Sequence, residues 1–391
     1  MQTRTFCILL ITAFSTMLGL GIISPFLPEF AQEHGANGFW IGMMFAGFGI
    51  SRGIVMPIVG RMSDRTGRKL FVAAGLLLYT VISLLYPKAD SVYAITAVRL
   101  AHGFAAGLIM PVVMAYVGEF AKEGNVGLAT GPLNMMFYFG LAMGPFLGGY
   151  IGQNYGFDSV FHVMSVLGGL TFLIVMFFLP EYKPSSAKPA ESLMSFTSLI
   201  KYNFIKAVLI AAVVVTLMMA VFMSFLPSLA TRIRIDPDHV GIIISIGIFL
   251  AGVLQIPCGR LADRFDHLGK LIQVGTGTCI GMFALFIMPF CPDFKALLGA
   301  GSLLGVGAAI SSSALLNISV NIGQKAGMGV WMGTLNAAMS IGFVLTPILS
   351  GIIMDHIGIN SVFYLFGFLM LFGAFGSAHF IRRRLLGFIK E

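Results

Sequence analysis

A few charged side chains stand inside long apolar stretches, and these are the residues most able to do chemistry. Arg99 and His102 share one such stretch, and Arg52 lies in another. A charge within a membrane-spanning helix costs at least about 2.5–3.5 kcal/mol on insertion scales, so it is a functional hypothesis by default and should face a cavity. Residues three positions apart share a helix face, which lets Arg99 and His102 lie together. We therefore expect this pair to serve a ligand or a proton, because histidine titrates near neutral pH.

Both His102 and Arg52 have a second interpretation. His102 could be a core histidine whose hydrogen bonds are satisfied by its neighbours. Arg52 could extend its guanidinium to the nearest membrane surface, as long basic side chains do. It could equally face the interior of the protein and bind an anion, and the sequence leaves these alternatives open.

The sixteen acidic residues all fall in loops or near the ends of apolar stretches, so none stands in mid-membrane. Glu29 ends the first stretch and Glu119 ends the fourth. A site for cations is better served by a buried acid, so this pattern favours a neutral or anionic ligand. If protons are bound, Glu29, Asp64, Glu119 and His102 are the candidates, and Glu29 is the best carboxylate among them.

The composition places these residues in a membrane protein. Of the 391 residues, 57% are hydrophobic and 10% are charged, and the mean hydropathy is +0.92. Soluble domains carry about 45–50% apolar and about 25% charged residues. The excess must face lipid, which excludes a soluble enzyme, a disordered protein and a nucleic-acid binder despite the net charge of +8. The four cysteines form no C-x-x-C pair and should pack as small apolar residues, so no metal site, disulfide or cofactor is predicted.

Twelve apolar stretches are long enough to span a bilayer, which takes about 20 residues. The first is too long for the apolar part of a signal peptide, so we expect it to be retained. A polar segment over residues 181–202 separates the sixth stretch from the seventh. The predicted spans are approximately 6–28, 39–59, 70–87, 91–117, 128–150, 159–180, 203–227, 239–258, 271–290, 296–317, 328–353 and 360–381.

Lysine and arginine are distributed unevenly over the connections between these spans. With the N-terminus inside, the inner segments hold 18 of the 24 basic residues and the outer loops hold four. Basic residues concentrate on the cytoplasmic side of membrane proteins. We therefore expect both termini in the cytoplasm and the protein in the plasma (inner) membrane, and the short loops favour a bacterial host.

The two halves of the sequence repeat each other, which predicts an all-α fold of two pseudo-symmetric six-helix halves. The halves cover residues 1–180 and 203–391, joined by a cytoplasmic linker over 181–202. Duplicated halves are typical of secondary transporters, whose site lies between them at the midplane. The repeated residues are Phe26, Leu27, Pro28 and Ala31 with Phe225, Leu226, Pro227 and Ala230; Gly60, Asp64 and Arg65 with Gly259, Asp263 and Arg264; and Asn134, Gly140, Pro145 and Gly149 with Asn336, Gly342, Pro347 and Gly351.

The segment from Gly60 to Lys69 resembles the G-x-x-x-D-R-x-G-R-[RK] signature of the major facilitator superfamily, and the resemblance covers the whole chain. It implies that Asp64 latches the cytoplasmic side by meeting helix 11, and that Arg99 matches a helix-4 arginine implicated in proton transfer. From the residues themselves, glycine permits the tight turns of a short loop. The second copy departs from the signature, which implies a weaker role there. The gating residues expected in the two copies are Gly60, Asp64, Arg65, Gly67, Arg68, Asp263 and Arg264.

A second motif lies in the fifth span. Its glycines are four residues apart and form a flat stripe that lets helices approach closely, and its proline invites a bend. The pattern resembles the antiporter motif G-x-x-x-G-P-x-x-G-G, and with Leu18-Gly19 it points to the twelve-helix drug:proton antiporter branch. Asn134 and Asn336 occupy matching places in the two halves and are expected to contact substrate. The motif residues are Gly140, Gly144, Pro145, Gly148 and Gly149.

Together these features predict a proton-coupled secondary transporter, not an enzyme, that exports amphipathic small molecules by alternating access. The alternative is a transporter of an anionic metabolite or lipid, which could work as uptake, because two arginines lie inside spans. The expected partners are a small-molecule substrate, protons and the lipid bilayer. The proton gradient is the driving force, and we expect a monomer that binds no nucleic acid.

Overall fold

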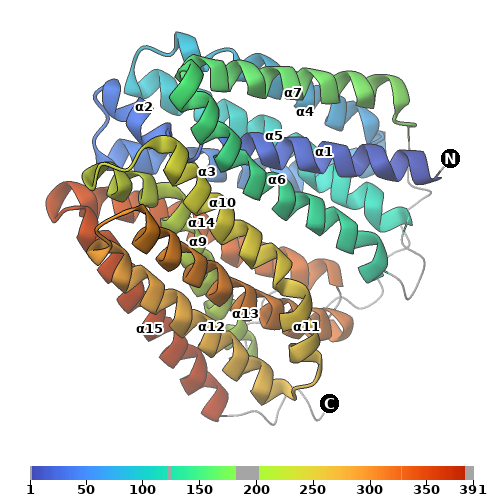
Figure 1. Ribbon diagram of the computed structural model, residues 1–391. Coiled ribbons are helices and arrows are strands. Elements are labelled where there is room, and N and C mark those ends of the chain that lie inside the picture. Colours follow the sequence, from blue (N-terminus) through green and yellow to red (C-terminus); the bar gives the residue numbers. More distant parts are fainter. Residues whose placement is uncertain (1, 121–125, 182–201, 327, 384–391) are drawn as a thin grey trace. The chain divides into compact units, whose positions relative to one another are not determined.

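The computed structural model describes residues 2–120, 126–181, 202–326 and 328–383, and within them every regular element is a helix. The chain forms two compact units, residues 1–187 with 226–245 and residues 188–225 with 246–391. Figure 1 follows the helices along the chain. They are α1 (Gln2–Ile22), α2 (Leu27–Glu33), α3 (Gly38–Thr66), α4 (Lys69–Ser83), η1 (Tyr86–Lys88), α5 (Val92–Phe120), α6 (Val126–Tyr155), α7 (Phe157–Phe178), α9 (Asn203–Arg232), α10 (Pro237–Val253), α11 (Gln255–Asp263), α12 (His267–Ile287), η2 (Met288–Phe290), α13 (Phe294–Ala326), α14 (Met328–His356) and α15 (Ile359–Arg383).

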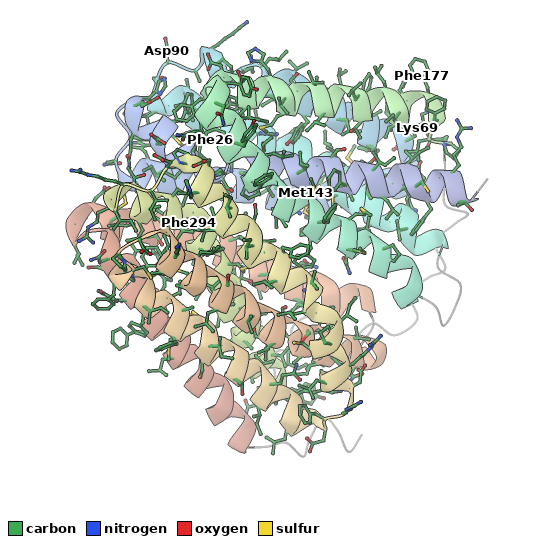
Figure 2. The ribbon with its side chains drawn as sticks, in the orientation of Figure 1. Phe26, Lys69, Asp90, Met143, Phe177 and Phe294 are labelled. Carbon is green, nitrogen blue, oxygen red and sulfur yellow. The ribbon has the colours of Figure 1, made fainter. Side chains whose placement is uncertain are left out.

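Eleven helical segments of the described chain are long and apolar enough to cross a membrane, and the described side chains of α15, over 359–371, are apolar as well. Many of their large side chains face outward. Figure 2 contrasts Phe177 on α7, which is 74% exposed, with Phe26, which is completely buried. Apolar surface on this scale marks a membrane protein. The predicted all-α integral membrane fold is therefore confirmed.

Each unit has its own core of packed helices. In the first unit α1 packs along α6, α5 packs along α3 and α4, and α7 covers α4. Ile109, Val112 and Val113 of α5 lie at the centre of this core. In the second unit α12 packs against α13 and α15, and α13 also contacts α11 and α14. Fully burying an aliphatic side chain stabilises a fold by about 1.5–3 kcal/mol, so these cores hold the buried polar groups in place.

The first predicted span is two helices rather than one. Helix α1 ends at Ile22 and α2 begins at Leu27, whereas the repeat copy α9 runs unbroken through Pro227. The sequences differ at Pro25, where the second copy has Ser224. Proline donates no hydrogen bond and its ring clashes with the carbonyl four residues before it, so Pro25 stops α1.

The eighth predicted span is interrupted as well. Helix α10 ends at Val253 and α11 begins at Gln255, but together they form one apolar segment, Pro237–Asp263, that is long enough to cross a membrane and includes the predicted span over 239–258. Pro257 explains the break because its ring crowds the carbonyl of Val253, four residues earlier.

The turn expected at Gly60 is also absent. Helix α3 continues through Gly60 to Thr66, and only Gly67 adopts a positive φ, of 108°. A side chain in that conformation is strained, so Gly67 ends the helix as predicted. Gly60 is an ordinary helical residue, and the hydroxyl of Ser63 donates to its carbonyl over 2.9 Å.

Candidate functional site

Arg99 on α5 is enclosed by protein. Its side chain is 1% exposed, and its Nε donates to the Met44 carbonyl of α3 over 3.0 Å. The guanidinium carbon lies 4.7 Å from the centre of the Phe48 ring, a cation–π contact worth about 2 kcal/mol or more when it is desolvated. Nη1 has no hydrogen-bond partner among the described residues. The Phe45 ring of α3 lies 5.7 Å from the guanidinium carbon, so Arg99 is a buried cation that α3 holds by one hydrogen bond and two aromatic rings.

The face of α5 that carries Arg99 packs against α3. A Cβ on Gly103 would clash with the Phe48 carbonyl, and one on Gly107 would lie 2.9 Å from the Val55 side chain. These glycines let the two helices approach closely. The glycine face below Arg99 is thus covered by α3, and that Arg99 serves a cavity stays a prediction.

His102 lies in the same buried region as Arg99, as the spacing predicts. It is 1% exposed, and its Nδ1 is 3.2 Å from the Tyr86 hydroxyl, which also interacts with Arg99. The Tyr79 ring packs 4.1 Å from the imidazole, centre to centre. We call Tyr79, Tyr86, Arg99 and His102 the Arg99 cluster. His102 Nε2 and the Tyr79 hydroxyl find no partner among the described atoms, so the cluster holds polar groups that a buried water would satisfy.

The two tyrosines of the Arg99 cluster were missed by the sequence reasoning. They lie seven residues apart near the end of the third apolar stretch, a spacing that places two residues on one helical face. That spacing, together with two hydroxyl groups in an otherwise apolar run, was the available signal. Nothing local indicates that they would meet α5.

The Tyr79 hydroxyl reaches α1 at Gly19. A Cβ on Gly19 would clash with the hydroxyl oxygen and lie 3.0 Å from the ring carbon that bears it. Glycine is therefore required at this position because it leaves room for the phenol. The contact joins the Arg99 cluster to α1.

Glu29 lies in the first turn of the short helix α2 and is half-buried. Burial raises the pKa of its carboxyl, and the nearby charges of Glu33 and Asp236 raise it further. A carboxyl of this kind keeps its proton to a higher pH than a free glutamate does. Of the four proton-binding candidates, Glu29 thus has an environment that favours protonation.

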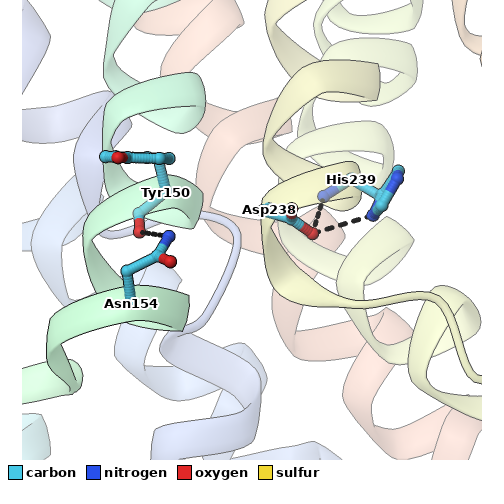
Figure 3. Close-up of polar contacts among 4 residues, drawn as sticks. All are labelled: Tyr150, Asn154, Asp238 and His239. Atoms are coloured by element: carbon cyan, nitrogen blue, oxygen red, sulfur yellow. Dashed lines mark hydrogen bonds and ion pairs between the residues drawn. The ribbon is translucent and has the colours of Figure 1, made fainter.

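The acidic surroundings of Glu29 continue at the start of α10. The Asp238 carboxylate accepts from the His239 backbone over 2.6 Å and contacts its Nδ1 at 2.8 Å (Figure 3). Asp236, Asp238 and His239 offer ligand atoms within 4.8 Å of one another. Exposed acidic groups of this kind are common without an ion, so we assign no metal site here.

The glycine motif of α6 packs on the backbone of α1. A Cβ on Gly140 would lie 2.5 Å from the Phe14 carbonyl oxygen, one on Gly144 would lie 2.5 Å from that of Leu18, and one on Gly148 would clash with Ile22. The three glycines thus form the flat stripe that their spacing predicts. Helix α6 continues without interruption through Pro145.

Gly149 of this motif faces a different helix. A Cβ there would lie 2.6 Å from the Pro237 carbonyl oxygen, and a Cβ on Gly241 of α10 would clash with the Pro145 carbonyl oxygen. Both segments belong to the first unit. One motif therefore sets two close helix contacts, with α1 and with the start of α10.

The other predicted substrate residues, Arg52, Asn134 and Asn336, are not members of the Arg99 cluster. Arg52 on α3 is partly buried, and its Nε has no partner among the described residues. Asn134 on α6 and Asn336 on α14 are exposed within their own units. Their role in substrate binding stays a prediction.

In the first copy of the gating motif, Arg68 and Gly67 contact the end of the first half. The Glu181 carboxylate accepts from the backbone N–H of Arg68 over 2.8 Å and of Lys69 over 3.3 Å, so it caps the start of α4. A Cβ on Gly67 would lie 2.5 Å from the same carboxylate. The Arg68 side chain donates from Nη1 to the Ala115 carbonyl over 2.8 Å. The side chains of Asp64, Arg65 and Glu119 lie outside the described part of the structure.

In the second copy, Asp263 ends α11 and its carboxylate accepts a hydrogen bond from the Asn317 amide of α13. Arg264 follows as an exposed residue at the helix end. The weaker role expected for this second copy of the motif stays a prediction. The sequence did not indicate the contact between Asp263 and α13.

Comparison with known proteins places this architecture in a family. The family model described as "Major Facilitator Superfamily" matches residues 9–209 and again residues 208–385. An uncharacterized MFS-type transporter of Methanocaldococcus jannaschii is 28% identical, over 90% of this chain and 92% of that protein. Multidrug resistance protein 2 of Bacillus subtilis is 27% identical, over 95% of this chain and 94% of that protein. Among solved structures, an inward-facing bacterial homolog of the human lysosomal transporter Spinster aligns with a TM-score of 0.83 at 14% identity, covering 98% of each chain.

The two successive matches of one family model agree with the internal repeat, and the solved structure has the same fold. The sequence signature from Gly60 to Lys69 and the glycine motif of α6 lie within the first match. The chain therefore belongs to the major facilitator superfamily and is an integral membrane secondary transporter, not an enzyme.

Proposed function

We propose that this protein is a proton-coupled exporter of amphipathic small molecules that works by alternating access. The observation that carries the proposal is the glycine motif of α6, because Gly140, Gly144 and Gly148 each meet the backbone of α1. In the resemblance to drug:proton antiporters this motif belongs to the moving part of the transporter. The similarity to a multidrug resistance protein of Bacillus subtilis supports the same substrate class.

Proton coupling in this proposal depends on Glu29 and the Arg99 cluster. Glu29 has a carboxyl whose pKa is raised by burial and by neighbouring acids, so it keeps a proton to a higher pH than a free glutamate does. The Arg99 cluster contains the imidazole of His102 and connects to α1 through the Tyr79 hydroxyl at Gly19. Helix α1 packs along α6 as well, so the Arg99 cluster and the glycine motif meet the same helix.

The decisive experiment is transport by the purified protein in proteoliposomes under an imposed pH gradient. Cationic, neutral and anionic fluorescent dyes are compared side by side, with protein-free liposomes as the control. We expect neutral and cationic amphipathic dyes to move only while the gradient is present, and a protonophore to stop them. Gradient-independent movement would contradict proton coupling.

A second candidate substrate class is an anionic metabolite or lipid, and Arg52 is the observation that favours it. Its Nε is buried without a partner among the described residues, whereas Arg99 is closed in by α3. If Arg52 binds an anion, Arg52→Gln should weaken transport of anionic dyes and leave neutral dyes unchanged. Equal effects on both classes would instead favour a guanidinium that reaches the membrane surface. Movement of anions alone in wild-type vesicles would replace the multidrug proposal with this one.

A further inference from the structure

A polar cavity lies in the second unit where α11 ends and α12 begins. Its volume is about 410 Å³, which is within the range of small-ligand pockets. Polar groups from three helices border it, and Leu316 adds an apolar edge. The lining residues that matter here are Gln255, Asp263, Lys270, Ser313, Leu316 and Asn321. We call this cavity the Lys270 groove.

Lys270 is the unusual member of the groove. Its side chain is only 8% exposed, and no hydrogen bond or ion pair of its ammonium is present among the described residues. A buried charge without a partner is costly, so buried ammonium groups are normally paired. Because Lys270 borders the cavity, an anion inside the groove would supply the missing partner.

The first half shows how the equivalent position is satisfied internally. Arg68 precedes Lys270 by 202 residues, the offset that relates the fifth and eleventh spans, and each follows a glycine, Gly67 or Gly269. Arg68 donates to the Ala115 carbonyl, and the Glu181 carboxylate caps the adjacent start of α4. In the second half the position of Glu181 is occupied by Arg383, a cation. The start of α12 is capped instead by the Asp266 carboxylate, which accepts from the Gly269 backbone N–H over 2.7 Å, whereas Lys270 has no described partner and lies beside the cavity.

The surface around the groove is apolar. Leu316, Ile256 and Ile272 are 46%, 65% and 61% exposed, and they come from α13, α11 and α12. All three lie on helical segments that are long and apolar enough to cross a membrane. A ligand with an anionic head and an apolar tail matches this combination. Lys270 also lies in the first turn of α12, where the helix dipole favours negative charge.

We propose that the Lys270 groove binds the phosphate of a membrane phospholipid headgroup. Lys270 pairs with the phosphate, and the Ser313 hydroxyl and Asn321 amide supply further donors at the cavity wall. The Asp263 carboxylate accepts from the Asn317 amide and also lines the groove, so Lys270 offsets its negative charge when the phosphate binds. This inference requires nothing of the substrate or of the direction of transport.

Native mass spectrometry of the purified full-length protein in detergent tests the proposal by titration with dioleoyl phosphatidylglycerol. We expect one lipid to bind more tightly than the rest, and Lys270→Gln to weaken that binding about tenfold. Lys270→Arg keeps the charge and should stay within about twofold of wild type. The matched control is Lys295→Gln, which removes an exposed lysine from the other end of α13 in the same unit and should change nothing. If Lys270→Gln does not fold, Asn321→Leu removes a lining amide and should weaken the same lipid.

Two further ligands separate the sources of the phosphate. Dioleoylglycerol has the same tails without phosphate and should not occupy the tight site. Inorganic phosphate tests a soluble ligand, and Lys270-dependent binding of phosphate without tight lipid binding would overturn the assignment to a lipid. Equal binding of phosphatidylglycerol and dioleoylglycerol would overturn the site itself. Tight lipid binding that neither Lys270→Gln nor Asn321→Leu weakens would overturn it as well.

Discussion

At the residue scale, Arg99 is a buried cation that contacts no described carboxylate. Its partners among the described residues are the Met44 carbonyl, the Phe45 and Phe48 rings and the Tyr86 hydroxyl. A group this enclosed acts on transport through its neighbours, so we regard Arg99 as a positioning residue for α3 and the Arg99 cluster. Arginine suits this role because its planar guanidinium stacks on an aromatic ring while it donates hydrogen bonds.

Arg99→Gln is expected to reduce transport at least tenfold while the protein remains expressed and monodisperse. The glutamine keeps polarity but loses the charge and the contact with the Phe48 ring. The matched control is Arg4→Gln, because Arg4 also lies 4.7 Å from an aromatic ring, that of Phe178, but is exposed. Transport in proteoliposomes measures both variants. Loss of folding in Arg99→Gln would point to a purely structural arginine, and equal losses in both would remove any special role.

Glu29 should make both stability and transport depend on pH. Its folded-state pKa is raised, so the protonated carboxyl is stabilising at low pH, and this contribution is lost as pH rises through the raised pKa. Asp236→Asn removes one cause of the shift and should move the midpoint of the pH dependence to lower pH. Asp90→Asn, which removes an exposed acid elsewhere in the first unit, is the control. Thermal unfolding and transport are measured across pH 4–8, and an unmoved midpoint would exclude Asp236 as a cause.

At the scale of the elements, glycine positions decide how closely helices approach. The glycines of α6 face backbone atoms of α1, so no side chain there can turn away to make room. By contrast, Gly53 and Gly60 on α3 have nothing within 4 Å of an added Cβ. The same residue type is thus a packing requirement in one helix and replaceable in another, and only the neighbouring helix makes the difference.

Gly148→Ala is expected to destabilise the protein by about 1–3 kcal/mol, because the methyl group overpacks the contact with Ile22. Gly60→Ala should be neutral or stabilising by up to about 1 kcal/mol, because alanine is the better helix former and space is free. Thermal unfolding in the same detergent compares the two. A tolerated Gly148→Ala would mean that α1 and α6 pack less closely than described.

Gly19 and Tyr79 should be energetically coupled. Gly19→Ala places a methyl group against the Tyr79 phenol, and Tyr79→Phe removes the hydroxyl that meets it. We expect the double variant to be more stable than the added effects of the two single variants predict. The interaction free energy from the double-mutant cycle should be about 0.5–3 kcal/mol. Additive effects on thermal stability would show that the hydroxyl does not approach α1.

At the scale of the whole molecule, the two halves share ancestry but differ in how their inner helix ends are stabilised. The first half caps α4 with Glu181, and the second half binds Asp263 to Asn317 and leaves Lys270 beside a cavity. An alternating-access cycle needs contacts that break and form again, and unequal halves provide unequal contacts. The resemblance assigns the first of these contacts to Asp64.

Asp64→Asn is expected to slow the transport cycle and leave substrate affinity nearly unchanged. The amide keeps the shape of the side chain but removes the charge that the latch requires. Initial rates and apparent substrate affinity in proteoliposomes separate the two effects, with Asp90→Asn as the matched loss of an exposed carboxylate. A large loss of affinity would exclude a latch.

Much of the fold follows from the sequence because a bilayer imposes simple rules on it. Spans must be apolar and about 20 residues long, so composition and length located the helices. The repeat offsets of 199 and 202 residues indicated two halves, and the glycine spacing of α6 predicted its flat stripe. The breaks at Pro25 and Pro257 were readable in principle, but proline interrupts some membrane helices and is accepted by others such as α9. Local sequence does not distinguish these outcomes.

The sequence by itself determined the family, the spans and the pairing of Arg99 with His102, because each depends on residues close together in the chain or on an exact repeat. Only the tertiary structure decided what surrounds them. It closed α3 over Arg99, brought Tyr79 and Tyr86 to His102, and left Lys270 beside a cavity while Arg68 is bound. These outcomes depend on contacts between helices that are distant in the chain, and such contacts leave no periodic signal in the sequence.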